Sequence, residues 1–319
     1  MEILDDQKRH LDFWGEGSKL FGIFIVNMLL TLVTLGLYYP WARAATMKYI
    51  YQETEFEGSR FAFHGTGKEM FIGFIKAIGI FGGLYLILFL FMWVQKPLFT
   101  LFGFLIFFTG MSLLTPIAIH GALRYRMSRT SWRGIHFGYR GQLSELIRIC
   151  IIGFLLTLVT FGIYSFWFEM KLRRYLIQNI RFGSVQFSFR GDGTDWFGLN
   201  LGGYFLTIFT LGIYGFWWMK DRLKFQFSNI RIHQDESTIK IKTSFTGGNF
   251  FGLVVVNAIL MVITLGLATP WIMIRNIKYI FDNIVLDGPF NADAIEQTEE
   301  DYRDATGDDL MDALDMGMM

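Results

Sequence analysis

The chain has 319 residues, of which 52% are hydrophobic and 18% aromatic, and its mean hydropathy is +0.37. This composition is too apolar for an ordinary soluble protein. The single cysteine, Cys150, excludes a disulfide framework and a cysteine metal cluster, and the five histidines do not cluster at ligand spacing. The net charge of +1 combines a basic body of 28 Lys and Arg against 18 Asp and Glu with ten acidic residues and one basic residue from Asp293 onward.

The hydrophobic residues gather in six stretches of 20 to 26 residues, and only the second stretch contains a charge, Lys76. A helix needs about 20 residues to cross the hydrocarbon core of a bilayer. The sequence therefore predicts an α-helical polytopic membrane protein with about six apolar helices, and its acidic first residues do not resemble a cleaved signal peptide. The stretches cover residues 20–39, 70–94, 98–119, 149–168, 196–219 and 249–274.

One eight-residue pattern, Thr-x-x-Thr-x-Gly-x-Tyr, recurs in three stretches, and a tryptophan follows three residues after each tyrosine. The pattern stands at residues 31–38, 157–164 and 207–214. The last stretch keeps Thr264, Gly266 and Trp271 in the same register, and Pro116 occupies in the second copy the place of Pro40 in the first. Repetition at so many fixed offsets predicts one structural unit that is copied five times.

Each unit continues with a basic amphipathic helix, and four units then alternate aromatic and polar residues up to a glycine, as in a short β-hairpin. These hairpins are predicted at residues 56–65, 132–141, 182–191 and 239–247. We divide the chain into 1–19, an N-terminal polar segment; 20–65, repeat 1; 66–141, repeat 2 with two apolar stretches; 142–191, repeat 3; 192–247, repeat 4; 248–286, repeat 5; and 287–319, an acidic tail predicted to be disordered.

The element Thr-Leu-Gly-x-Tyr-x-x-Trp, the phrase Phe-Ala-Phe-His-Gly-Thr-Gly at residues 61–67 and the repeated apolar stretches carry a family resemblance. Through these features, residues 15–285 resemble the YjgN-like family of bacterial inner-membrane proteins. The resemblance implies a multi-pass protein of the bacterial inner membrane. It transfers no functional residues, because the family is a domain of unknown function.

The basic segments pose a topological problem. Lys and Arg in short loops favour the cytoplasmic side, yet five of the six apolar stretches are followed by a basic segment. Six ordinary crossings cannot place all five segments on one side. Ordinary crossings with some basic loops outside are the preferred interpretation, because each stretch is long enough to span. The alternative is that the single-stretch copies are re-entrant hairpins that turn at the Thr-x-Gly element.

Polar residues within the apolar stretches are candidates for a polar membrane face. Small and hydroxyl residues also let helices pack closely in lipid, which is the preferred interpretation, and Lys76 lies near enough to the start of its stretch to extend to the interface. The candidates are Asn27, Thr31, Thr34, Lys76, Thr157, Thr160, Thr207, Thr210, Asn257 and Thr264. The repeated tryptophans are predicted to be interfacial anchors: Trp41, Trp167, Trp217 and Trp271.

No catalytic, cofactor-binding or metal-binding pattern is recognisable, so we expect a protein that is not an enzyme. The basic body favours anionic lipid headgroups over nucleic acid. Two functions remain open. The first is a membrane scaffold or accessory subunit that presents a basic cytoplasmic platform to a membrane protein partner. The second is a small-solute transporter or channel, which would ordinarily need more ionisable groups at the membrane midplane. The oligomeric state is left open.

Overall fold

The computed structural model describes residues 8–298, which form ten α-helices, ten β-strands and one short 3₁₀ helix, η1 (Ala292–Ala294). The helices are α1 (Gly17–Val33), α2 (Tyr39–Gln52), α3 (Gly67–Trp93), α4 (Pro97–Ser128), α5 (Leu143–Val159), α6 (Ser165–Gln178), α7 (Gly193–Phe209), α8 (Gly215–Ser228), α9 (Gly247–Ile263) and α10 (Thr269–Asp282). The strands are β1 (Leu11–Phe13), β2 (Thr54–Phe56), β3 (Ser59–Phe63), β4 (Thr130–Trp132), β5 (Ile135–Tyr139), β6 (Ile180–Phe182), β7 (Val185–Phe189), β8 (Ile230–Gln234), β9 (Ser237–Thr243) and β10 (Ile284–Asp287).

All ten strands belong to one antiparallel sheet, in which each strand pairs with the next along the chain. Strand pairs alternate between tight hairpins, such as β2 with β3, and long-range pairs, such as β3 with β4. A bridge between Arg9 and Leu286 brings the chain before β1 against β10. The sheet is therefore nearly closed, and the first and last parts of the described chain meet at its seam.

The inner face of the sheet holds the largest hydrophobic core. Alternate strand residues point inward, so all ten strands supply side chains to it, and seven of them supply a buried side chain. The chain after β10 adds Ile295 and Phe290 to the same cluster. The buried members are Phe56, Trp132, Phe182, Val185, Ile232, Ile239, Leu286 and Ile295.

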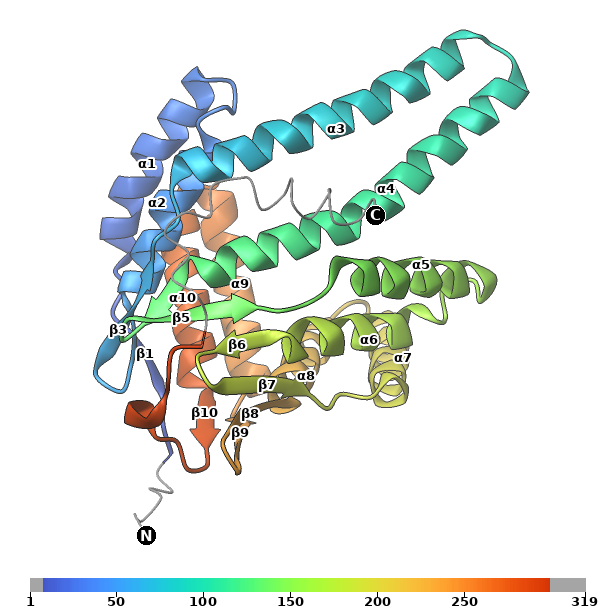
Figure 1. Cartoon of the computed structure of the whole chain (residues 1–319). Coiled ribbons are helices and arrows are strands. Elements are labelled where there is room, and N and C mark those ends of the chain that lie inside the picture. The colour runs from blue at the N-terminus through green and yellow to red at the C-terminus, as the bar shows by residue number, and fades with distance from the viewer. Residues whose placement is uncertain (1–7, 299–319) are drawn as a thin grey trace.

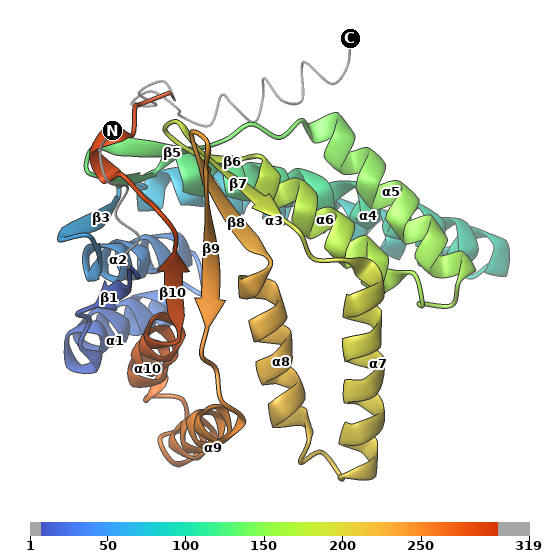
Figure 2. The same ribbon diagram turned by 90° about the horizontal axis from the view of Figure 1, so that it is seen from below.

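The helices form five antiparallel hairpins that spread away from the sheet (Figures 1 and 2). Each helix packs against the one before it and the one after it, and α10 packs against α1. The hairpin of α3 and α4 is the longest and extends beyond the others (Figure 1). The four shorter hairpins share their dimensions, with a first helix of 17 residues and a second of 14.

The expectation of about six apolar spanning helices is wrong. Only α3 and α4 are long and apolar enough to cross a membrane among the described residues. Each of the other four apolar stretches is interrupted by a turn, because the chain enters the left-handed region there; in the first, φ is 50° at Leu35 and 93° at Gly36. The expectation also missed the sheet, since it treated each hairpin as a separate element.

The division into five repeats stays a prediction, although the equal helix lengths and the shared turn positions agree with a common unit. Residues 299–319, which hold most of the predicted acidic tail, lie outside the described residues. The last described part of this segment, up to Thr298, runs along the sheet. Arg133 pairs with Asp293 at 2.8 Å, and the Thr298 hydroxyl donates to the carbonyl of Gly183 at 2.7 Å.

Candidate functional site

The tips of the four short hairpins are built by one hydrogen-bonding scheme. At the first tip, the Thr34 hydroxyl accepts from the backbone N–H of Tyr38 at 3.0 Å and donates to the carbonyl of Leu30 at 2.7 Å. The N–H of Gly36 donates to Thr31 at 2.7 Å, which closes the helix end. The tips at Thr160, Thr210 and Thr264 repeat the hydroxyl contacts. The threonine and glycine of the repeated pattern are thus turn-forming residues.

The residue between that threonine and glycine is large, apolar and almost fully exposed in all four tips. Leu35 is 93% exposed and Phe161 97%, while Leu211 and Leu265 reach 94% and 93%. Each has a φ of 50° or 51°, a conformation that costs little for glycine and more for a large side chain. Neither burial nor backbone preference therefore accounts for these residues.

The structure does not bring the predicted polar face together into a shared path. The hydroxyls of Thr31 and Thr157 donate to carbonyls four residues earlier in their own helices, at 2.6 and 2.7 Å. The hydroxyl of Thr207 is buried, and no partner for it is found among the described residues. These contacts are local to each hairpin.

The remaining polar candidates are also separate from one another. Asn27 is buried in α1, whereas the Asn257 amide donates to the Asn276 side chain at 2.8 Å within the hairpin of α9 and α10. Lys76 is half-buried in α3. A polar membrane face made by these residues stays a prediction.

The predicted anchor tryptophans connect neighbouring hairpins. Trp41 packs so closely on Gly67, the first residue of α3, that a Cβ there would clash with the indole. The same contact joins Trp167 to Gly193 and Trp217 to Gly247, and Trp271 packs on Gly17. The last pair joins the final hairpin to the first and so closes the ring of helices. Whether these indoles also lie at a membrane interface stays a prediction.

One junction lacks this tryptophan–glycine lock. In the register set by Pro40 and Pro116, the tryptophan is replaced by Ile117, and α5 begins with Leu143 instead of glycine. Both members of the lock have therefore changed together within one chain. The substitution pattern indicates that the glycine is required because the indole occupies the space of its side chain.

Tyrosines on the second helices hold the beginnings of the first helices. The Tyr175 hydroxyl donates to the carbonyl of Gln142 and accepts from its N–H, both at 2.7 Å, and Tyr49 makes the same pair of contacts with Glu16. Burial raises the pKa of the Tyr175 hydroxyl, which keeps the donor protonated. This clamp ties the two helices of a hairpin together at the sheet end.

The long hairpin has an ionic network at its base. Glu69 caps α3 together with Thr66, accepts from the Arg129 guanidinium at 2.7 Å, and accepts from the Tyr125 hydroxyl at 3.1 Å. The Arg129 side chain is only 8% exposed and that of Glu69 19%. An ion pair that is this buried is stable only with such additional hydrogen bonds.

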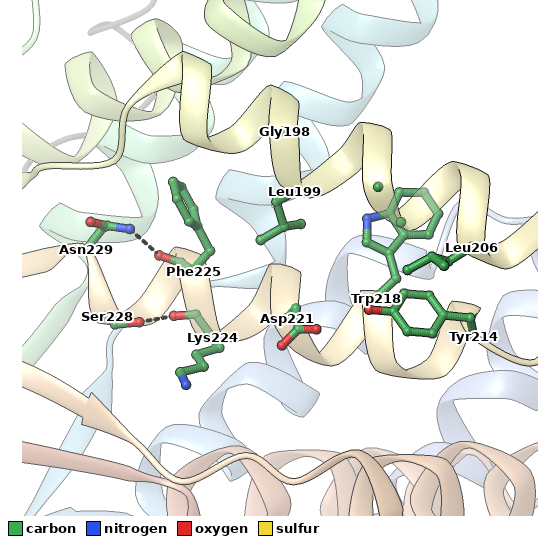
Figure 3. A pocket seen from close by; sticks show the side chains of 12 residues that line it. Gly198, Leu199, Leu206, Tyr214, Trp218, Asp221, Lys224, Phe225, Ser228 and Asn229 are labelled. Carbon is green, nitrogen blue, oxygen red and sulfur yellow. Dashed lines mark hydrogen bonds between the residues drawn. The ribbon is translucent and has the colours of Figure 1, made fainter.

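A groove of about 480 Å³ runs along the seam between α7 and α8. Figure 3 shows Leu206, Tyr214 and Trp218 at one end of the groove. Asp221, Lys224 and Asn229 lie toward the other end, together with Phe225. The side chain of Asn229 is already bonded to the carbonyl of Phe225 at 2.8 Å. Within residues 8–298, no group of three His, Cys, Asp or Glu side chains could hold a metal ion.

Comparison of the sequence with known proteins identifies its family. The sequence profile of DUF898, described as a bacterial protein of unknown function, matches residues 8–188 and 234–313. The chain belongs to this family. The predicted resemblance to YjgN-like proteins is confirmed, because curated relatives carry that name. No solved structure matches this DUF898 protein.

Two relatives of this DUF898 chain are described as inner membrane protein YjgN. The one from Salmonella typhimurium is 31% identical over 173 residues, which cover 50% of this chain and 41% of the relative. The one from Escherichia coli O157:H7 is 33% identical over 127 residues, or 40% and 30% of the two chains. The chain thus spans less than half the length of either relative. Their names support an inner-membrane location, and the number of crossings stays a prediction.

Sequence reasoning missed two groups of residues in this DUF898 protein. The Glu69–Arg129 pair joins positions that are 60 residues apart, and no local spacing points to it. The glycines at the helix starts could have been found, because Gly17, Gly67, Gly193 and Gly247 occupy one register and Leu143 replaces glycine only where the tryptophan is absent. That internal covariation is the signal that was overlooked.

Proposed function

We propose that this protein is a scaffold or accessory subunit of the bacterial inner membrane. In this proposal α3 and α4 cross the bilayer, and the sheet presents a basic platform on the cytoplasmic side to a membrane protein partner and to anionic lipid headgroups. The positive-inside rule supports this orientation, because the basic segments lie on the second helices, which lead back to the sheet.

The observation that carries the proposal is the contrast between the two faces of the sheet. The inner face is filled by the hydrophobic core, whereas the outer face and the strand ends carry exposed cations. Arg140 and Arg190 follow β5 and β7 at equivalent positions, and Lys240 points outward from β9, where the neighbouring Lys242 pairs with Asp287 at 2.7 Å. A charged, solvent-facing wall next to a membrane suits docking to an acidic partner surface.

The transporter or channel alternative draws no support from these contacts. The threonines proposed to line a solute path are largely bonded within their own helices, and the inner face of the sheet is packed with side chains. We therefore propose the platform as the single function of this protein.

A charge-reversal experiment tests the platform. Full-length protein carrying Arg190→Glu and Lys240→Glu is crosslinked in native membranes and compared with wild type, and Lys96→Glu at the tip of the long hairpin is the control. We expect a reproducible partner that is lost on reversal at the sheet and kept in the control. The absence of any specific partner, together with solute flux through wild-type proteoliposomes, would overturn the proposal.

A further inference from the structure

The five hairpins differ in length by an amount that matters in a bilayer. The first helix of the long hairpin has 27 residues and that of each short hairpin 17, a difference of ten. At about 1.5 Å per residue, ten residues correspond to about 15 Å, or roughly half of a hydrocarbon core that is about 30 Å thick. A short hairpin that entered the bilayer from the same surface and in the same direction as the long one would therefore end near the middle of the bilayer.

The chemistry of the tips follows this difference in length. The turn of the long hairpin contains Gln95 and Lys96, and Trp93 beside it is 75% exposed, as suits a far interface with water. The short tips contain no charged residue from the end of the first helix to the start of the second. They run through residues 33–38, 159–164, 209–214 and 263–268.

The backbone N–H groups of the short tips are satisfied internally. At the first tip, each N–H from Thr34 to Tyr39 donates to a group within the same hairpin, including the Thr34 hydroxyl. The tip at Phe161 repeats these bonds from Thr160 to Ser165. Irregular backbone at membrane depth has no water to bond, so internal partners for its N–H groups lower the cost of placing it there.

We propose that the four short hairpins are re-entrant: they enter the bilayer from the sheet side and end within the hydrocarbon, where lipid acyl chains surround Leu35, Phe161, Leu211 and Leu265. Among the described residues, the long hairpin alone then reaches the far surface. Most of the membrane-embedded volume lies in the leaflet next to the sheet. This inference rests on the proposed membrane location and not on the platform.

Cysteine accessibility tests the depth of the tips. In a Cys150→Ser background of the full chain, single cysteines replace Leu35, Phe161, Lys96 or Lys240. Right-side-out and inverted vesicles are treated with a membrane-impermeant maleimide. Denaturation in detergent followed by a second label counts the cysteines that were present but protected.

We expect Lys240→Cys and Lys96→Cys to label from opposite sides. Leu35→Cys and Phe161→Cys should label about tenfold less than these controls from either side, since hydrocarbon excludes the charged reagent. Labelling of the tips from the Lys96 side would show full crossings and overturn the proposal. Labelling from the Lys240 side would place the tips outside the bilayer and overturn it equally. Neither result depends on a partner, so the platform proposal stands or fails separately.

Discussion

The long hairpin and the four short hairpins share one construction at the sheet and differ at their far ends. In four of the five, the first helix begins with a glycine beneath a tryptophan of a neighbouring hairpin. The short hairpins end in an apolar left-handed turn, and the long one ends in Gln95 and Lys96. On our account, the far end of a hairpin, and not its hydrophobicity, distinguishes a crossing hairpin from a re-entrant one.

The base of the long hairpin should be the most sensitive point, because it carries the buried ion pair. Glu69→Gln removes the carboxylate that pairs with the buried Arg129 guanidinium, and the expected cost is about 3–5 kcal/mol in the free energy of unfolding. Denaturant titration of the purified protein in bicelles measures it. The control is Glu145→Gln, which removes an exposed pair with Arg148 and should leave stability unchanged. Equal effects of the two variants would contradict the special role of this base.

The next largest effect should separate the two kinds of tip. Leu35→Asp places a carboxylate in the hydrocarbon on our account and should cost about 2.5–3.5 kcal/mol. Gln95→Asp makes the same change in charge at the polar tip of the long hairpin, where φ is 55°, and should be nearly neutral. Stability of both variants in bicelles is the measurement. If the polar tip is as sensitive as the apolar one, the two classes of hairpin are not distinct.

A smaller effect should appear at the lock that closes the ring of helices. Gly17→Leu should clash with Trp271 and cost about 1–3 kcal/mol, and Trp271→Ile should lose part of the indole contact. The double variant recreates the residue pair found at Ile117 and Leu143, so it should recover about 1 kcal/mol or more relative to the sum of the two single changes. A double-mutant cycle on unfolding free energies measures this coupling. Strict additivity would show that the two residues do not form a unit.

The sequence indicated the apolar stretches and the recurring Thr-x-Gly element, but not what that element does. A count of apolar residues does not detect a residue in the left-handed conformation. An apolar stretch that is interrupted by a turn therefore could not be distinguished from a continuous spanning helix. The preference for ordinary crossings followed from length alone. Leu35 and Gly36 show why this was insufficient, since two residues with positive φ redirect the whole stretch.

The sheet could not be predicted from alternation within each hairpin. The pairs that join the hairpins into one sheet connect residues far apart in the chain, such as Phe61 with Trp132 and Arg9 with Leu286. Local periodicity indicates that a segment is extended, but it does not identify the strand with which that segment pairs. The tryptophans were recognised as a repeated feature, yet their packing on helix-start glycines needed the three-dimensional arrangement.

The depth of a tip relative to the far surface tests the central claim most directly. Spin labels on Phe161→Cys and Lys96→Cys, in the Cys150→Ser background, are exposed in bilayers to oxygen and to a water-soluble nickel chelate. Our account predicts high oxygen and low nickel accessibility at position 161 and the reverse at position 96, because oxygen concentrates in hydrocarbon and the chelate stays in water. Equal accessibility to the nickel chelate at both positions would contradict it.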